Sequence, residues 1–290
     1  MARCAFLGLG VMGGPMAGHL VAAGHEVAVY NRTAAKADAW VTAHGGRSAG
    51  TPAAAATGAE FVLLCLGNDD DVRSVVHGDE GVLASTPRNA VIVDHTTASA
   101  DLARELAAAA EALGAGFVDA PVSGGQAGAQ NGTLTIMCGG SNQAFDRVEP
   151  VLRSYGRAVT LMGDAGAGQL TKMVNQICIA GLLQGLAEGA NFARAAGLDT
   201  DRVVEVIAKG AAQSWQMENR WPTMIRDEFE FGFAVDWMRK DLGICLDEAK
   251  RNGAALPVTA LVDQFYRQIQ MAGGGRWDTS SLIRNLSSRR

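Results

Sequence analysis

The sequence predicts an α/β domain with a doubly wound, mostly parallel sheet over residues 1–164, joined by a long helix to an all-α domain over residues 165–290. Three observations support this fold class. Short apolar runs typical of strands alternate with alanine-rich segments in the first half, a glycine loop follows the first run, and strand-like runs stop after about Gly163. Alternating strands and helices form a parallel sheet with helices on both faces, so we expect that architecture for the first domain.

The expected strands lie within the runs CAFLGLG, EVAVY, FVLLCL, VIVDH, FVDAPV, LTIMCGG and AVTLMG. Between two of these runs, residues 101–116 read DLARELAAAAEALGAG, with an acidic residue at the start and a stop signal at Gly114. This pattern predicts an amphipathic helix that covers the sheet.

The second domain is expected to be helical. Residues 168–197 contain no proline, and between Lys172 and Arg194 the only charged residue is Glu188. A helix that is apolar on nearly all sides is usually buried, so we expect this one to be the spine between the domains. Gly197 predicts its end, and further helices are expected over residues 202–209, 235–252 and 257–271.

The composition is that of a globular protein with ample material for a packed core, because hydrophobic residues make up 48% and charged residues 19% of the 290 positions. The net charge of -5 lacks the basic excess of a nucleic-acid binder. Five scattered cysteines indicate neither a disulfide framework nor a metal site. The longest apolar stretches are shorter than a membrane span. We therefore expect a cytoplasmic protein without a nucleic-acid or membrane partner.

The loop FLGLGVMGGPM has the spacing G-x-G-x-x-G, between a strand-like run and a helix-like run. In a Rossmann domain the first glycine makes the tight turn, the second lets the backbone approach a pyrophosphate, and the third lets helix and strand pack closely. The phosphates then lie at a helix N-terminus, where free N–H groups favour negative charge. The alternative is a glycine-rich turn without a ligand. The residues expected to contact a dinucleotide are Gly8, Leu9, Gly10, Val11, Met12 and Gly13.

The end of the second strand bears on the choice between NADP and NAD. A protein that binds NAD usually carries an acidic residue there for the ribose hydroxyls, whereas this chain has Asn31, Arg32 and Thr33. An arginine could stack on adenine and pair with a 2'-phosphate. We therefore expect NADP as the cofactor, with NAD as the alternative.

The chain resembles the β-hydroxyacid dehydrogenases, a family that includes 3-hydroxyisobutyrate dehydrogenase, tartronate semialdehyde reductase and the glyoxylate/succinic semialdehyde reductases. The resemblance covers nearly the whole chain and is carried by FLGLGVMGGPMAGHL, DAPVSGGQAGAQNGTL, GDAGAGQLTKMVNQ and RKDLGICLDEAK, in the family's order and spacing. It implies an oxidoreductase that transfers a hydride between a nicotinamide cofactor and a small 3-hydroxy acid, semialdehyde or 2-oxo acid. It also implies a homodimer or homotetramer.

The resemblance assigns roles to two further motifs. Ser123, Gly124 and Gly125 correspond to the turn that holds the substrate carboxylate, although the same residues could form a plain β-turn. Lys172 aligns with the family's catalytic lysine, where an ammonium can protonate the alkoxide that hydride transfer leaves. Without the resemblance, Lys172 would be interpreted as a surface lysine. Asn175, three positions further on the same helix face, could bind substrate or orient the amine.

Three more residues correspond to family positions that touch the cofactor: Leu66, Thr97 and Lys240. Lys240 would come from the second domain. In this chain Gln176 stands where many relatives have a second asparagine, and Gly67 where they often have proline. The first departure is a hint about the substrate, and the second indicates a looser loop than in those relatives.

The histidines do not form a ligand cluster, so no metal is expected, and His95 beside Asp94 is interpreted as a capped strand end rather than a proton relay. Two alternative functions remain. Imine reductases share the first glycine loop and the NRT motif but generally lack the lysine. A non-catalytic nucleotide-binding protein on this fold would not need Ser123, Lys172 and Asn175 together.

Overall fold

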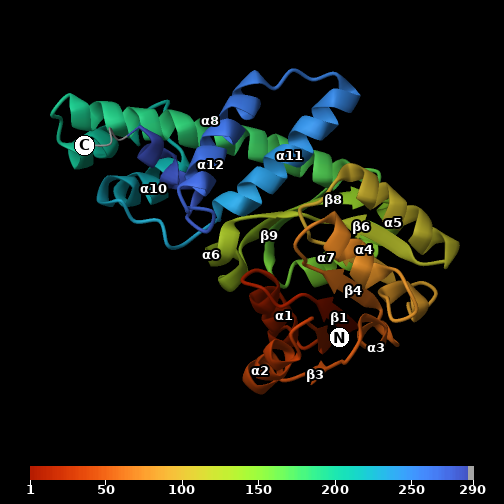
Figure 1. Ribbon diagram of the computed structural model, residues 1–290. Coiled ribbons are helices and arrows are strands. Elements are labelled where there is room, and N and C mark those ends of the chain that lie inside the picture. Colours follow the sequence, from red (N-terminus) through yellow and green to blue (C-terminus); the bar gives the residue numbers. More distant parts are fainter. Residues whose placement is uncertain (287–290) are drawn as a thin grey trace. The chain divides into compact units, whose positions relative to one another are not determined.

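The computed structural model describes residues 1–286 of the chain (Figure 1). Its internal contacts divide the chain into a first unit, Met1–Lys172, and a second unit that starts at Met173. The first unit is a sheet with helices on both faces, and the second is helical. The predicted fold class, a Rossmann-type α/β domain joined by a long helix to an all-α domain, is confirmed.

The described residues of the first unit form a nine-stranded sheet with the order β3-β2-β1-β4-β5-β6-β8-β7, in which β9 also pairs with β8. Neighbours from β3 to β6 are parallel, as are β8 and β9, whereas β8 runs antiparallel to β6 and β7. The strands are β1 (Arg3–Leu7), β2 (Glu26–Tyr30), β3 (Arg47–Ser48), β4 (Phe61–Leu64), β5 (Val91–Asp94), β6 (Gly116–Asp119), β7 (Val122–Ser123), β8 (Leu134–Gly140) and β9 (Gly156–Gly163).

Side chains that alternate along the strands supply two separate hydrophobic cores. Phe6 belongs to the core on the face covered by α1 (Gly13–Ala22), α2 (Ala34–His44), α6 (Gly125–Gln130) and α7 (Asn142–Leu152). Leu7 belongs to the core on the other face, under α3 (Pro52–Ala56), α4 (Asp69–Val76), η1 (Val82–Ala84) and α5 (Ala100–Ala112). Successive residues of a strand point to opposite faces, so nearly continuous apolar strands are what a sheet buried on both sides requires.

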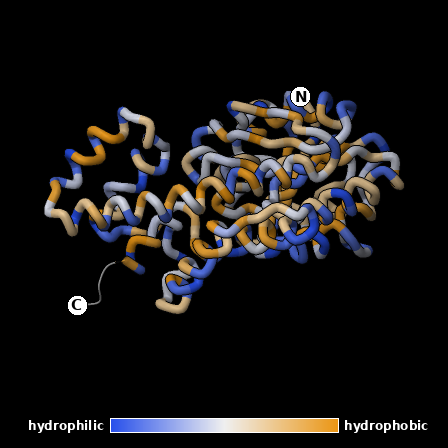
Figure 2. Tube along the Cα trace, turned by 90° about the horizontal axis from the view of Figure 1, so that it is seen from above, coloured by the Kyte–Doolittle hydropathy of each residue, from blue (hydrophilic) through white to orange (hydrophobic). Residues whose placement is uncertain are grey.

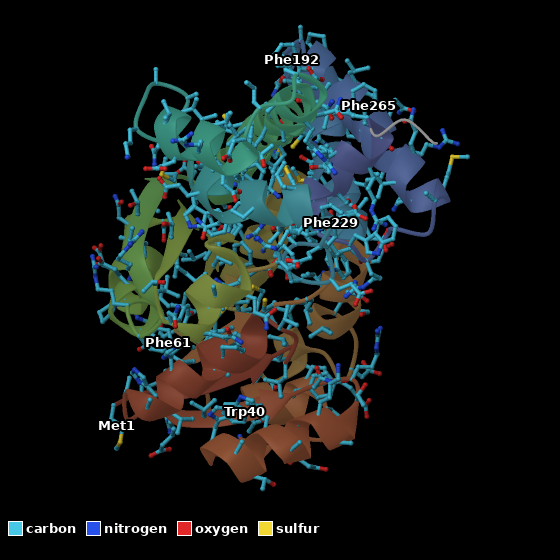
Figure 3. All side chains as sticks on the ribbon, turned by 90° about the vertical axis from the view of Figure 1, so that its left-hand side faces the viewer. Met1, Trp40, Phe61, Phe192, Phe229 and Phe265 are labelled. Carbon is cyan, nitrogen blue, oxygen red and sulfur yellow. The ribbon has the colours of Figure 1, made fainter. Side chains whose placement is uncertain are left out.

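Trp40 shows how a helix is fixed against the glycine-rich start of the chain (Figure 3). Its indole Nε1 donates to the carbonyl oxygen of Gly14 at 2.9 Å, and its ring is 7% exposed. The buried indole therefore has a partner for its single donor, as a tryptophan in a core needs.

The helix α8 (Ala167–Ala195) begins in the first unit and continues through the second (Figure 1). The remaining elements of the second unit are α9 (Thr200–Ile207), α10 (Trp215–Arg226), α11 (Val235–Asn252), α12 (Pro257–Met271) and η2 (Thr279–Asn285). The bounds expected for α11 and α12 are confirmed.

A buried carboxylate joins the segments around η2. Asp278 accepts hydrogen bonds from the backbone N–H groups of Phe233 and Ser280 at 2.9 and 3.0 Å, and it pairs with Arg220 Nε at 3.1 Å. The guanidinium of Arg284 stacks on Phe229, which Figure 3 labels, at 5.1 Å from the ring centroid. These contacts fasten the end of the described chain to the second unit.

Several local expectations were incomplete. The short strands β3 and β7 and the helix α10 were not predicted, because two-residue strands and a helix containing Pro222 leave weak periodic signals. The expectation that α8 is buried on nearly all sides is wrong for one side. Val174 is 60% and Phe192 72% exposed.

Figure 2 shows that hydrophobic residues alternate along the chain with residues of intermediate and hydrophilic character. No helix among the described residues is both long enough and apolar enough to cross a membrane. Three of the cysteines, Cys4, Cys138 and Cys245, are buried.

Candidate functional site

The carboxyl ends of the parallel strands form one row at the edge of the sheet. Tyr30 pairs with Leu7, Leu7 with Leu64, Leu64 with Asp94, and Asp94 with Asp119. The loops that follow these strands therefore start side by side. In open parallel sheets ligands bind at this edge, near the point where the strand order reverses, which here lies between β1 and β4.

The first glycine loop follows β1, and two of its glycines are required by the protein itself. Gly8 has φ +99°, and a Cβ atom there would lie 2.3 Å from the carbonyl oxygen of Cys65. A Cβ at Gly13 would lie 2.0 Å from the carbonyl oxygen of Gly8. Both distances are shorter than any contact a side chain can make, so only glycine allows this turn and the close approach of α1.

Gly10 is different, because the protein leaves open space around it. A Cβ at this position would meet no atom within 4 Å. The first turn of α1 contains no acidic residue, and its N-cap residue, Met12, makes no side-chain capping hydrogen bond. An exposed glycine before an uncapped helix N-terminus leaves room and N–H groups for a phosphate. The loop therefore fits the pyrophosphate of a dinucleotide.

Asn31 and Thr33, at the end of β2, are held against this loop. Asn31 Oδ1 accepts from the N–H of Leu9 at 3.0 Å, and its Nδ2 donates to the carbonyl oxygen of Thr33 at 3.1 Å. Thr33 is the N-cap residue of α2 but makes no side-chain capping hydrogen bond. Asn31 thus fixes the shape of the loop, and the exposed Thr33 hydroxyl is left available to a ligand.

Arg32 extends from the same segment with its side chain 89% exposed. Its Nη1 lies 3.5 Å from Oδ1 of Asp71, a carboxylate in the first turn of α4. The sequence indicated that β2 ends without an acidic residue, and that is correct for β2. It could not show that a carboxylate from another element reaches Arg32, because the two residues are 39 positions apart.

Leu66 and Thr97 lie in the loops after β4 and β5, and Leu66 lies beside the glycine loop. The N–H of Leu66 donates to Oγ1 of Thr96 at 2.9 Å, which links the two loops. A Cβ at Gly8 would lie 2.9 Å from Cδ2 of Leu66. Thr97 is half-buried. The predicted cofactor residues of the first unit are therefore neighbours along one edge of the sheet.

The Ser-Gly-Gly segment forms the end of β7 and the start of α6. Ser123 pairs with Thr135 of β8. Gly124 and Gly125 have φ values of +129° and +60°, which side chains rarely adopt. A Cβ at Gly125 would meet nothing within 4 Å. The two glycines give the backbone an unusual course and leave the space around Gly125 open.

Lys172 lies in the second turn of α8 and is 7% exposed, so it is not the surface lysine that its place in a long helix could indicate. The start of the helix is held by two buried side chains that the sequence analysis missed. Asp119 accepts from the N–H groups of Gly166 and Gln169 at 2.7 and 2.8 Å. The side chain of Gln169 bonds the backbone of Thr96 and Ala98.

Asn175 and Lys240 belong to the second unit, where Gln176 and Asp241 link them. Asn175 Nδ2 donates to Gln176 Oε1 at 2.8 Å, and Gln176 Nε2 donates to Asp241 Oδ2 at 2.6 Å. Lys240 Nζ lies 3.2 Å from Asp241 Oδ1 and 5.8 Å from the centroid of the Trp237 ring. The sequence pointed to the lysine but not to the aspartate beside it.

Burial raises the pKa values of two carboxyl groups at the ends of β5 and β6. Desolvation raises the pKa of Asp94 to about 7, against the lowering effect of its hydrogen bonds from Thr96. It likewise raises the pKa of Asp119 to about 6, although backbone hydrogen bonds from Gly166 and Gln169 oppose the shift. Each carboxyl group is therefore easier to protonate than an exposed one.

His95 is fully engaged inside the first unit. Its Nδ1 lies 2.7 Å from the carbonyl oxygen of Ala120, and its Nε2 lies 2.8 Å from the hydroxyl of Tyr155. A carbonyl oxygen only accepts, so Nδ1 carries the proton and Nε2 accepts from the tyrosine. Burial lowers the pKa of His95 to about 4, which keeps the ring neutral. The ring therefore joins buried backbone and core groups.

Comparisons with known proteins agree with this geometry. A family model described as the NAD binding domain of 6-phosphogluconate dehydrogenase matches residues 3–163, and one described as the NAD-binding domain of NADP-dependent 3-hydroxyisobutyrate dehydrogenase matches residues 166–286. A 3-hydroxyisobutyrate dehydrogenase of Pseudomonas aeruginosa is 37% identical over 273 residues, which cover 92% of this chain and 91% of that protein. The chain belongs to the β-hydroxyacid dehydrogenase family.

Other members of the family match the whole chain. An uncharacterised oxidoreductase of Shewanella frigidimarina is 63% identical over 290 residues, which cover 100% of both chains. The structure of Mycobacterium tuberculosis 3-hydroxyisobutyrate dehydrogenase with L-serine has a TM-score of 0.90 and 32% identity, and the match covers 99% of this chain and 100% of that one. As a member of the family, this protein is an NAD(P)-dependent oxidoreductase that uses a nicotinamide cofactor.

Proposed function

We propose that this β-hydroxyacid dehydrogenase transfers a hydride between NADP(H) and a small 3-hydroxy acid, or the matching semialdehyde or 2-oxo acid, with Lys172 as general acid and base. The observation that carries the proposal is a buried lysine in a helix whose first turn is bonded to the ends of β5 and β6. Those strand ends lie in the same row as the glycine loop.

The proposed chemistry needs one proton at one nitrogen. A dinucleotide held at Gly8, Gly10 and Gly13 would supply or accept the hydride through its nicotinamide ring. In the reducing direction, the carbonyl oxygen of the substrate gains negative charge as its carbon gains the hydride, and the Lys172 ammonium donates the proton that completes the hydroxyl group. In the oxidising direction, the neutral amine accepts the hydroxyl proton while the carbon loses the hydride. Burial excludes water that could otherwise exchange protons with the amine.

The substrate carboxylate is proposed to bind the Ser123 hydroxyl and the backbone N–H groups of Gly124 and Gly125. The open space at Gly125 supports this role, since no protein atom fills it. Asn175 is proposed to orient the substrate or the amine. The relative whose structure was solved with L-serine binds a small molecule with both a carboxylate and a hydroxyl group, which agrees with this substrate class.

A substrate panel tests the proposed activity. The loss of NADPH absorbance is followed with glyoxylate, succinic semialdehyde, methylmalonate semialdehyde and tartronate semialdehyde. Removal of a general acid lowers kcat by about 10²- to 10⁴-fold, so the kcat of Lys172→Ala is expected to fall by a factor in that range. Lys209→Ala, which removes an exposed lysine from the turn just after α9, is the matched control. A folded Lys172→Ala variant with unchanged kcat would disprove the proposed role.

NADP is proposed as the preferred cofactor, because Arg32 is exposed at the end of β2 and available to a 2'-phosphate. The nearby Asp71 would compete for Arg32 and repel that phosphate. We expect kcat/KM to be higher with NADPH than with NADH, and Asp71→Asn to raise that ratio about two- to fivefold, since exposed ion pairs contribute about 1 kcal/mol or less. Asp70→Asn is the control, because Asp70 pairs with Arg73 instead. A preference for NADH would contradict the proposal.

A further inference from the structure

The start of α8 is attached to the sheet by a carboxylate that lies far from it in sequence. Asp119, at the end of β6, is fully buried and accepts from the N–H of Gly166 through Oδ1 and from the N–H of Gln169 through Oδ2. Both N–H groups lie at the start of a helix, where they lack partners within the helix. Asp119 of β6 therefore caps α8. It precedes Gly166 by 47 residues and Gln169 by 50.

Gln169 makes a second attachment in the same turn. Its Oε1 accepts from the N–H of Ala98 at 3.1 Å, and its Nε2 donates to the carbonyl oxygen of Thr96 at 2.7 Å. The side chain is 1% exposed. The two bonds use the amide's donor and acceptor in fixed directions, so they set both the position and the rotation of the helix relative to β5.

Two glycines allow the helix to come this close. A Cβ at Gly168 would lie 2.3 Å from the carbonyl oxygen of Met137, and a Cβ at Gly139 would lie 2.5 Å from Oδ1 of Asp119. Neither position has room for a methyl group. The approach of α8 to β6 and β8 is thus a tightly fitted contact rather than a loose loop.

Lys172 follows Gln169 by three residues, so the two side chains leave neighbouring points on one face of α8. We propose that Gln169 and Asp119 are positioning residues that hold the Lys172 amine at the reacting carbonyl. They act through the lysine and do not touch substrate or cofactor. This inference rests on the proposed role of Lys172, and it adds two residues to which neither the sequence motifs nor the comparisons give a role.

Gln169→Ala is the decisive variant. It removes both side-chain hydrogen bonds but leaves the Asp119 and Lys172 side chains themselves unaltered. A displacement of about 1 Å in a catalytic group can cost about 100-fold in rate, so we expect kcat to fall about 10- to 100-fold. The KM for NADPH, measured with glyoxylate or succinic semialdehyde as the probe substrate, is expected to change less than kcat, although Gln169 also bonds both neighbours of Thr97.

Gln184→Ala is the matched control on the same helix. Gln184 is also buried, at 8% exposed, but its amide bonds Glu188 within α8. Loss of a buried glutamine from α8 is common to both variants, so both can lower the melting temperature. Only Gln169→Ala is expected to lower kcat. Equal kcat values for these two variants would overturn the inference.

A double variant shows whether Gln169 acts through the lysine. With Lys172→Ala already present, adding Gln169→Ala is expected to change the residual kcat less than about twofold, because residues that act as a unit are not additive. The same fold loss in both backgrounds would mean that Gln169 has a general structural role, and would overturn the inference.

Asp119→Asn provides an independent second measurement. Asparagine has the same size, but its NH₂ group would face one of the two N–H groups that the carboxylate accepts. We expect a loss of kcat in the same range as for Gln169→Ala, with a smaller change in the KM for NADPH. If Asp119→Asn does not fold, Gln169→Ala alone decides.

The failure of this inference differs from a failure of the proposed function. If Lys172→Ala loses activity and Gln169→Ala retains it, the positioning role is wrong and the catalytic role of the lysine stands. If Lys172→Ala itself keeps the wild-type kcat, both are wrong.

Discussion

Among single residues, Asp94 shows a conflict between burial and charge. It is 2% exposed at the end of β5, and desolvation raises the pKa of its carboxyl group from 3.8 to about 7. Because the pKa is higher in the folded protein than in the unfolded chain, the protonated form favours folding. The contribution of this carboxyl group to the free energy of unfolding is therefore fully present below about pH 4, and it is lost as the pH rises through about 7.

Asp94→Asn is therefore expected to stabilise the protein at about pH 8, by roughly 1–3 kcal/mol, and to have little effect near pH 4. The asparagine oxygen can still accept from the N–H of Thr96, as Oδ1 of Asp94 does now at 2.9 Å. Urea unfolding at both pH values measures the difference. Asp146→Asn, an exposed carboxylate on α7, serves as the control. A variant that is less stable than the wild type at the higher pH would contradict this expectation.

At the scale of elements, the glycines around the start of α8 differ sharply from those further along the same helix. Gly168 has no room for a Cβ, whereas a Cβ at Gly185 would meet nothing within 4 Å. The two positions lie in one helix, but only Gly185 has room for a larger side chain.

Gly168→Ala is expected to destabilise the protein by about 2 kcal/mol or more, because the new methyl group must displace backbone atoms. Gly185→Ala is expected to stabilise it by about 0.5–1 kcal/mol, since alanine favours a helix over glycine. Thermal unfolding of both variants measures the contrast. Similar effects in the two variants would show that the close contact at Gly168 yields more easily than the distances indicate.

The sequence predicted the long elements because their periodic patterns are strong. The helices α11 and α12 have the expected bounds, and the apolar runs became strands in a sheet covered on both faces. Spacing also identified the glycine loop, whose Gly8 and Gly13 have no room for side chains. The roles expected for the lysine and the Ser-Gly-Gly segment depended on the resemblance.

Contacts between distant segments could not be predicted. Asp71 reaches Arg32 from 39 positions away, and Asp119 caps a helix that begins more than 40 residues later. Neither carboxylate belongs to a local pattern that marks such a partner. A helix N-terminus without its own capping residue is a usable signal, because its N–H groups must find acceptors elsewhere.

At the scale of the whole molecule, the second unit exposes many large apolar side chains. Those exposed by more than half are Val174, Phe192, Leu198, Val206, Trp215, Val258, Leu261 and Met271. Exposed apolar side chains that form a continuous patch are typical of an interface. We propose that the protein forms a homodimer or homotetramer through this unit.

Light scattering is expected to give at least twice the mass of one chain. Phe192→Asp is expected to shift that mass toward the monomer, since a charge buried without a partner opposes association. Met162→Asp, which changes a 46% exposed methionine in the first unit, is expected to leave the mass unchanged. A monomeric mass for the wild type would contradict the proposal.

The division of α8 between the two units bears on how the molecule opens. Amide hydrogens exchange with solvent when the cooperative unit that contains them opens. The amides up to Lys172 belong to the first unit and those from Met173 to the second. Deuterium uptake along this single helix is therefore expected to differ between the part in the first unit and the part in the second.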